Sequence, residues 1–170
     1  TFKKGLGQNF LTSRNILEEI VDAAEIESGV IEVGPGFGVL TSELAQNSDK
    51  VVTIEIDERL IDVLNYTLAE YDNVKIINED ILKLDLKKVI DDEFNGEKVS
   101  IAANLPYYIT TPIITKLLEE KLPIKNIVVM VQKEVAERMS AKPSTKDYGA
   151  ITVLCQYYTE PSIVANVPAS

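Results

Sequence analysis

An apolar run at 99–103 is followed by four residues that could grip a flat aromatic amine: Asn104, Leu105, Pro106 and Tyr107. The side-chain oxygen of Asn104 and nearby backbone carbonyls can accept hydrogen bonds from an exocyclic amino group. Pro106 stiffens the turn because its ring fixes φ and removes an N–H, and the Tyr107 ring can stack on a base pulled out of its helix. A polar turn after a buried strand would account for the same residues, so support must come from a second motif.

Upstream, an apolar run at 30–33 ends in a glycine-rich turn that contains Gly34, Gly36 and Gly38. Glycines let the backbone approach a ligand closely, and a turn that opens a helix presents N–H groups to it. A dinucleotide-binding turn has the spacing Gly-x-Gly-x-x-Gly, whereas here Val39 occupies the last of these positions. The observed order, Glu-x-Gly-x-Gly-x-Gly, fits an S-adenosylmethionine loop better.

Two acidic residues stand at the ends of the next strand-like runs, Glu55 after 51–54 and Asp80 after 74–78. A carboxylate about 20 residues after the glycine turn is placed to accept hydrogen bonds from both ribose hydroxyls of a nucleoside. Asp80 could accept one from the adenine amino group, and Asp57 could cap the following helix. Each acid alone could be an ordinary exposed carboxylate or cap. Together with the glycine turn, they predict one crevice at the carboxyl ends of parallel strands.

Alternating patterns along the chain predict the elements that hold these residues. Strand-like runs lie at 30–33, 51–55, 74–78, 99–103, 126–132 and 162–167. Helical patterns lie at 14–24, with Ser13 as its cap, and at 38–47, 57–70, 85–92, 111–120 and 132–140. This alternation predicts an α/β, Rossmann-like fold with a mostly parallel sheet and helices on both faces.

Two stretches near the end of the chain are ambiguous. Residues 148–158 have a strand-like composition, but their apolar residues recur at helical spacing, which predicts a helix. The turn-rich stretch 141–149 is either a plain connection or a loop that faces a substrate.

The composition excludes several classes of site. The chain of 170 residues is 45% hydrophobic, which is enough for one sizeable core. Histidine is absent, which excludes His-based catalysis and His metal ligands, and the single Cys155, with its apolar flanks, predicts a buried inert thiol and no metal site. We find no membrane-length apolar run and no signal-peptide pattern, so the expectation is a cytoplasmic protein without membrane contact.

The net charge of −10, from 17 basic and 27 acidic residues, argues by itself against a nucleic-acid binder. Its distribution is more informative, because the acids concentrate in the helical stretches 64–72 and 85–93. Basic residues flank the motifs instead: Lys3, Lys4, Arg14, Lys133, Arg138, Lys142 and Lys146. Scattered solubility charge is the alternative explanation for them.

These motifs together resemble the ribosomal small-subunit RNA adenine dimethyltransferase family, over essentially the whole chain. The segments Gly-Gln-Asn-Phe-Leu, Glu-Val-Gly-Pro-Gly-x-Gly-x-Leu-Thr, Glu-Ile-Asp, Glu-Asp-Ile, Asn-Leu-Pro-Tyr-Tyr and Gln-Lys-Glu-Val-Ala-Glu-Arg appear in the family's order. The resemblance implies that residues 1–170 form a catalytic domain that binds S-adenosylmethionine. It implies cofactor contacts at Asn9, Leu11, Gly34, Gly36, Glu55, Asp80 and Asn104, and catalytic roles for Asn104, Leu105, Pro106 and Tyr107.

The implied activity is adenine-N6 dimethylation of small-subunit ribosomal RNA, in the immature small ribosomal subunit, by a monomeric enzyme. The related macrolide-resistance methyltransferases act on large-subunit RNA and usually carry Ile after the Asn and Asn after the Tyr, so Leu105 and Tyr108 favour the small-subunit branch. A non-catalytic RNA-binding or assembly factor on the same fold is another alternative. A small-molecule methyltransferase is disfavoured, because it has no need to hold an adenine amine.

The family continues beyond the position of Ser170 with a Phe- and Pro-rich motif, a last strand and a small helical domain. We therefore expect the chain to be a fragment that binds the cofactor and methylates weakly. Without the last strand, the predicted strand 162–167 lacks its usual neighbour. We expect it to pair with 126–132, to pair with another molecule, or to lie loosely at the sheet margin.

Overall fold

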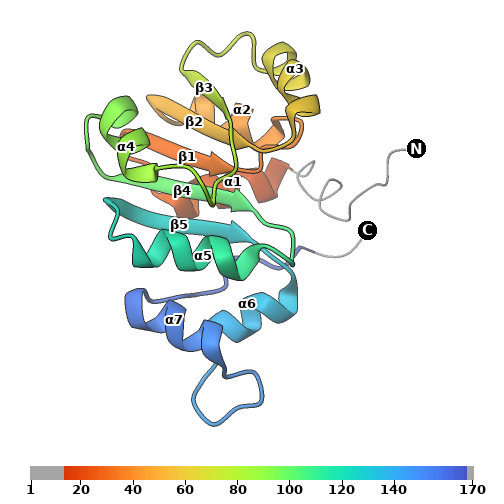
Figure 1. Ribbon diagram of the computed structural model, residues 1–170. Helices are drawn as coiled ribbons and strands as arrows, with labels where there is room; N and C mark the ends of the chain where they lie inside the picture. Colours follow the sequence, from red (N-terminus) through yellow and green to blue (C-terminus); the bar gives the residue numbers. More distant parts are fainter. Residues whose placement is uncertain (1–13, 168–170) are drawn as a thin grey trace.

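Five parallel strands form one sheet through the centre of the computed structural model, which describes residues 14–167 (Figure 1). The strand order across the sheet is β3-β2-β1-β4-β5, and each neighbouring pair is parallel. The strands are β1 (Gly29–Val33), β2 (Lys50–Glu55), β3 (Val74–Asn78), β4 (Val99–Asn104) and β5 (Ile124–Met130).

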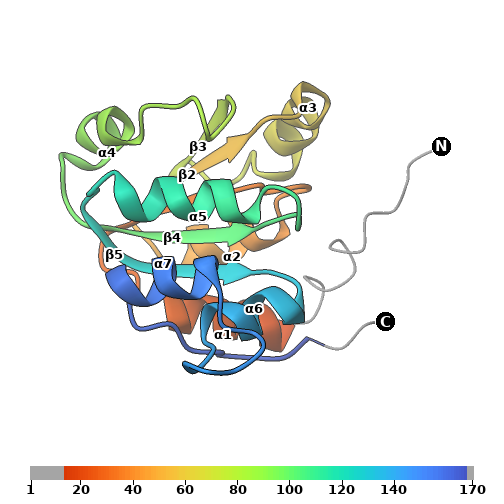
Figure 2. The ribbon, with the colours of Figure 1, turned by 60° about the horizontal axis from the view of Figure 1, so that its bottom comes forward.

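Helices cover both faces of the sheet, as the alternating pattern predicts, and the Rossmann-like α/β fold is confirmed. They are α1 (Arg14–Ala24), α2 (Val39–Gln46), α3 (Glu58–Thr67), α4 (Leu86–Phe94), α5 (Thr110–Glu119), α6 (Lys133–Met139) and α7 (Ala150–Tyr158). With the sheet seen from its edge, α5 lies on one side of β4 and α1 on the other (Figure 2). None of the helices in the described part is long and apolar enough to span a membrane.

The two faces of the sheet bury two separate apolar clusters. Ile31 and Val33 of β1 pack with the buried side chains of α4 and α5, whereas Val30 packs with those of α1 and α2. All five residues of β1 are buried, as expected for a central strand covered on both faces. The central strand β1 is therefore held between two apolar layers.

Asp57 caps α3, as predicted, because its side chain accepts a hydrogen bond from the backbone N–H of Arg59 at 3.0 Å. The helix predicted within 148–158 is also confirmed, as α7. The predicted cap Ser13 lies outside the described residues.

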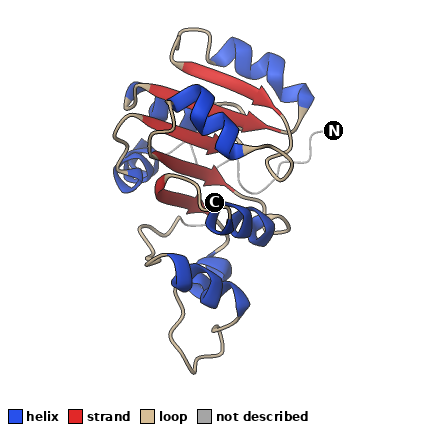
Figure 3. Ribbon diagram, turned by 60° about the vertical axis from the view of Figure 1, so that its left-hand side comes forward, coloured by secondary structure: helices blue, strands red, loops and turns tan. Residues whose placement is uncertain are grey.

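The prediction of a strand at 162–167 is wrong. Those residues are irregular and pair with no strand of the described chain, and Ile163 and Val164 are exposed. A strand needs a partner for its backbone N–H and C=O groups, and β-branched residues alone do not provide one. Of the three arrangements we expected, the unpaired one is observed. The sheet ends at β5, which begins two residues earlier than predicted, and α6 and α7 lie beyond that edge (Figure 3).

Candidate active site

The structure brings four predicted site residues to one edge of the sheet, at or just after the carboxyl ends of neighbouring strands. Across the sheet they follow the order Asp80, Glu55, Gly34 and Asn104. Val33 pairs with Ile54 on one side and with Ala103 on the other, so Gly34 lies between Glu55 and Asn104. The chain order reverses between β1 and β4, and ligands of open α/β sheets bind at such a switch point.

The glycine turn leaves β1 with a backbone that other residues rarely adopt. Gly34, Gly36 and Gly38 have φ values of 74°, 57° and 85°. A Cβ at Gly34 would lie 3.2 Å from the Asn104 carbonyl oxygen, so only glycine lets these two loops approach so closely. A Cβ at Gly36 would meet no atom within 4 Å, so this part of the turn faces open space. A ligand could therefore come close to the backbone at Gly36.

The Glu55 carboxylate is held in place at the end of β2. The residue is buried, and its Oε1 accepts a hydrogen bond from the backbone N–H of Asp57 at 2.8 Å. The Asn78 side chain donates to the Glu55 carbonyl at 2.8 Å and ties β2 to β3. One carboxylate oxygen is thus fixed by the protein, and the other can accept a hydrogen bond from a ligand hydroxyl.

Asp80 is half-buried and is fixed in a similar way. Its Oδ1 accepts a hydrogen bond from the backbone N–H of Leu82 at 2.9 Å, and its carbonyl accepts from Lys83 and Leu84. Both acids are therefore preformed acceptors on turns that their own side chains organise.

Sequence reasoning missed the apolar side chains of these same loops. Ile56 is 64% exposed and Leu82 is 37% exposed, next to Glu55 and near Asp80 respectively. Exposed apolar groups beside fixed polar acceptors provide the mixed lining that small-ligand sites have. Ile56 follows Glu55 directly and Leu82 comes two residues after Asp80, so their positions were visible in the sequence, but their exposure was not.

The Asn104 turn lies on the other side of Gly34, at the end of β4. Leu105 is buried, and its N–H donates to the Met130 carbonyl at 3.1 Å, which fixes the turn on β5. The Pro106 carbonyl accepts a hydrogen bond from the Thr110 hydroxyl at 2.9 Å and so is committed to α5. Asn104 itself is half-buried at the end of β4.

Tyr107 and Tyr108 follow this turn and point outward. Tyr107 is 68% exposed and Tyr108 is 73% exposed, and their rings meet edge to face with centroids 5.7 Å apart. Rings so exposed are available to stack on an incoming base.

A buried carboxylate, that of Glu32, lies at the end of β1 just before the glycine turn; the sequence motif includes this residue, but its burial was not predicted. Glu32 is 1% exposed, and its Oε2 accepts hydrogen bonds from the hydroxyls of Thr41 on α2, at 2.5 Å, and Thr53 on β2, at 3.1 Å. Burial raises the pKa of Glu32 to about 7; the two hydroxyls lower it, and nearby Glu55 raises it further. This carboxyl links three elements directly below Gly34.

Cys155 is part of the core and not of the site. Cys155 is buried, as predicted, and its burial raises the pKa of the thiol. No cluster of three or more metal-ligating side chains occurs within residues 14–167.

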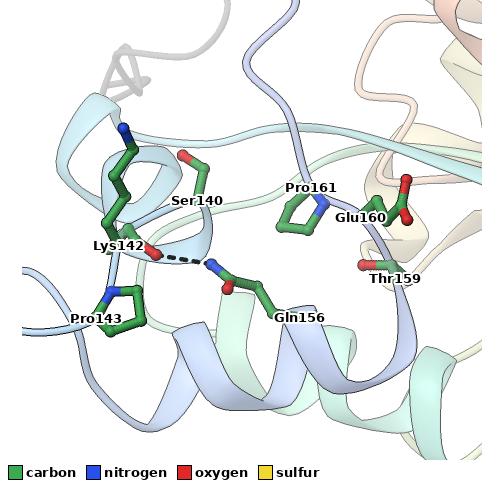
Figure 4. Close-up of a pocket in the computed structure, with 8 residues that line it drawn as sticks. Ser140, Lys142, Pro143, Gln156, Thr159, Glu160 and Pro161 are labelled. Carbon is green, nitrogen blue, oxygen red and sulfur yellow. Dashed lines mark hydrogen bonds between the residues drawn. The ribbon is translucent and has the colours of Figure 1, made fainter.

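A hollow of about 340 Å³ lies away from the crevice, between the end of α6, the end of α7 and the segment that follows (Figure 4). The Gln156 side chain in it donates to the Ala141 carbonyl at 2.8 Å, which fastens α7 to the loop after α6. This hollow therefore belongs to the packing of α7.

The predicted contacts Asn9 and Leu11, and the basic pair Lys3 and Lys4, lie outside the described residues. The structure places Gly34, Gly36, Glu55, Asp80 and Asn104 at the carboxyl edge of the sheet, where the crevice was predicted, with Leu105, Pro106 and Tyr107 following Asn104. Their roles in binding and catalysis stay predictions.

Comparison with known proteins identifies close relatives. The family model for ribosomal RNA adenine dimethylase matches residues 1–170. The chain is 56% identical, over 99% of its length, to ribosomal RNA small subunit methyltransferase A of Alkaliphilus oremlandii, and 57% identical, also over 99%, to the protein of that name from Bacillus mycoides. It spans 60% and 59% of the lengths of these two relatives.

Two solved structures are also similar. One is a dimethyladenosine transferase from Plasmodium falciparum, with 34% identity and a TM-score of 0.72 over 85% of this chain and 50% of that one. The other is the 23S rRNA methyltransferase ErmE, with 31% identity and a TM-score of 0.68 over 78% of this chain and 51% of that one.

Proposed function

The chain belongs to the ribosomal RNA adenine dimethylase family, and from this premise we propose that the full-length protein transfers methyl groups from S-adenosylmethionine to N6 of adenosines in small-subunit ribosomal RNA. Residues 1–170 would be its cofactor-binding catalytic domain. The observation that carries the proposal is the contact between the two loops: the Asn104 turn, suited to an adenine amine, meets the glycine turn at Gly34. A methyl donor on one loop and an acceptor on the other would thus be neighbours.

The residues of the crevice suit S-adenosylmethionine. Glu55 would accept hydrogen bonds from the ribose hydroxyls and Asp80 one from the adenine amino group, while Ile56 and Leu82 would contact the faces of the adenine. The open backbone at Gly36 would lie along the methionine part. When bound, this cofactor supplies a methyl group already activated on a sulfonium.

Positioning is then the main task of the protein. The N6 nitrogen of adenine is a poor nucleophile because its lone pair is delocalised into the ring. The Asn104 side chain and the Leu105 carbonyl would accept hydrogen bonds from the amino protons, which favours a pyramidal nitrogen aimed at the methyl group. Tyr107 would stack on the base and stabilise the developing positive charge. A general base is not required, because the cationic product amine is acidic enough to lose a proton to water.

Large-subunit RNA is the second candidate substrate, since ErmE, described as a 23S rRNA methyltransferase, shares the fold at 31% identity. Leu105, Tyr108 and the 56% identity to a protein named for the small subunit favour the first candidate. An assembly factor without catalysis is the remaining alternative. A cytoplasmic, monomeric enzyme is the form we propose, in line with a ribosomal RNA substrate.

Radiolabelled methyl transfer by the full-length protein tests the proposal, with immature small ribosomal subunits and large-subunit RNA as parallel acceptors. We expect label in the small subunit, and its loss with Asn104→Ala. Label only in large-subunit RNA would favour the second candidate. No transfer to either, with cofactor and RNA binding intact, would favour the assembly factor. A chain of residues 1–170 assayed alongside measures how much activity this part retains.

A further inference from the structure

A second hollow, of about 310 Å³, lies beside the Asn104 turn and is not part of the crevice. Tyr107, Thr111 of α5 and residues of α6 and α7 line it, and Asn104 does not. Its volume is at the lower end of the range for small-ligand sites, which suits one nucleotide and not several. The exposed Tyr107 ring is the wall that this hollow shares with the adenine position proposed above.

The lining is that of a site for a flat, partly polar group. Val135 and Ile151 supply apolar surface that packs against the main core. Thr111 and Gln132 supply a hydroxyl and an amide, groups that can both donate and accept hydrogen bonds. Aromatic or guanidinium planes for stacking, with polar groups at the edges, are how proteins hold unstacked RNA bases.

Arg138 is the cation of this hollow, and it has no partner among the described carboxylates. No ion pair involves it within residues 14–167, whereas Lys133 on the same helix pairs with Glu137 at 3.8 Å. Its planar guanidinium can stack on a base. Glu134 also lines the hollow, and its carboxylate would repel a phosphate but can accept a hydrogen bond from a base amino group. The lining therefore favours a base over a phosphate group.

We propose that this hollow holds the base of a nucleotide next to the target adenosine in the RNA, between Tyr107 and Arg138, with Thr111 and Gln132 at its edge. The proposal rests on the proposed function and adds a site that reads sequence context. Enzymes that act on an extruded base set their context preference through contacts with flanking nucleotides. The shared Tyr107 wall would couple occupancy of the hollow to placement of the target.

A double-mutant cycle on RNA and protein together tests this subsite in the full-length protein. Methyl transfer is measured on RNA whose base is removed at the position before or after the target, for the wild type and for Arg138→Gln. We expect the wild type to lose about tenfold in kcat/KM with one of the two abasic RNAs, the size of one stacked base. Arg138→Gln should lose a similar factor on intact RNA and little more on that abasic RNA, because both changes remove one contact.

Lys88→Gln is the control, because Lys88 is also an exposed cation but lies on α4, paired with Asp92. Losses that multiply independently, or an Arg138→Gln effect no larger than that of Lys88→Gln, would overturn the subsite. Those results would leave the proposed function standing, since the wild type would still methylate intact RNA. A wild type that methylates no adenosine would overturn the proposed function, and the subsite with it. Cofactor affinity should be the same in all three proteins.

Discussion

At the carboxyl ends of the strands, the site has two halves that differ in how their polar groups are held. On the side of β1, β2 and β3, the polar groups are buried or half-buried and already hydrogen-bonded: Glu32, Glu55 and Asp80. On the side of β4 and β5, the backbone of the Asn104 turn is hydrogen-bonded, but two side chains that follow it are free for a partner: Tyr107 is 68% exposed, and Arg138 has no ion pair in the described chain. A small cofactor of fixed shape suits a preformed cradle, whereas a base must enter from a larger RNA. We infer that the first half is organised in advance and the second is completed by its substrate.

Asn104→Ala in the full-length enzyme tests this difference between the two halves most strongly. If the side chain aims the nucleophile, as we propose, turnover should fall by about 100-fold, the typical cost of a misplaced reacting group. RNA affinity should change little. Single-turnover methyl transfer and a binding titration measure the two separately. An equal loss in both would mean that Asn104 is an RNA anchor and does not position the amine.

Glu55→Ala probes the preformed half. Losing charge-assisted hydrogen bonds to the ribose should weaken S-adenosylmethionine binding, at about 1.5–3 kcal/mol for each bond. Calorimetry on the variant measures the loss, and Glu58→Ala, in the exposed first turn of α3, is the matched control. Unchanged affinity would remove Glu55 from the site.

Tyr107 tests the substrate half with two substitutions. Stacking needs the ring and not the hydroxyl, so Tyr107→Phe should be mild, while Tyr107→Ala should lower kcat/KM by about tenfold or more. Cofactor affinity should be the same in both variants. If Tyr107→Phe is as inactive as Tyr107→Ala, the hydroxyl matters and the stacking role is wrong.

We also expect a pH dependence of stability from Glu32. Its pKa rises from 4.5 to about 7 on folding, so between these values the folded state holds a proton that the unfolded state has lost. Stability should therefore fall as pH rises from 4.5 to 7, by at most about 1.4 kcal/mol per pH unit from this group.

Glu32→Gln keeps the side chain neutral and able to bond Thr41 and Thr53, so it should remove that contribution. Urea unfolding of both proteins across this pH range isolates the effect of Glu32 from those of other carboxyls, such as Glu93, whose pKa is lowered by Lys50 and Lys75. Parallel curves for the two proteins would show that Glu32 does not titrate in this range.

The residues of the preformed half, on the side of β1, β2 and β3, could largely be predicted from the sequence. The glycine spacing, and the acids at the ends of apolar runs, are local signals, and the parallel sheet brings them together in a known way. The burial of Glu32 could not be read, because it depends on Thr41 and Thr53 from two other elements.

The sequence-based predictions fail where contacts between residues far apart in the sequence decide the structure. Residues 162–167 have a strand-like composition but no strand beside them in the described chain, and so they stay irregular. The exposure of Ile56 and Leu82 also depends on the tertiary fold, since an apolar residue after a strand is more often buried. Most residues that line the hollow between Tyr107 and Arg138 lie in two motifs visible in the sequence, but the hollow needs three helices to form, so its shape was not visible there.

The central claim is that the two halves meet to methylate the amino group of adenine. Nucleoside mass spectrometry of small-subunit RNA, after reaction with the full-length protein and S-adenosylmethionine, tests it most directly. The account predicts N6,N6-dimethyladenosine, present with the wild type and lost with Asn104→Ala. Methyl groups on another base or on ribose, in RNA that the wild type modifies efficiently, would contradict it.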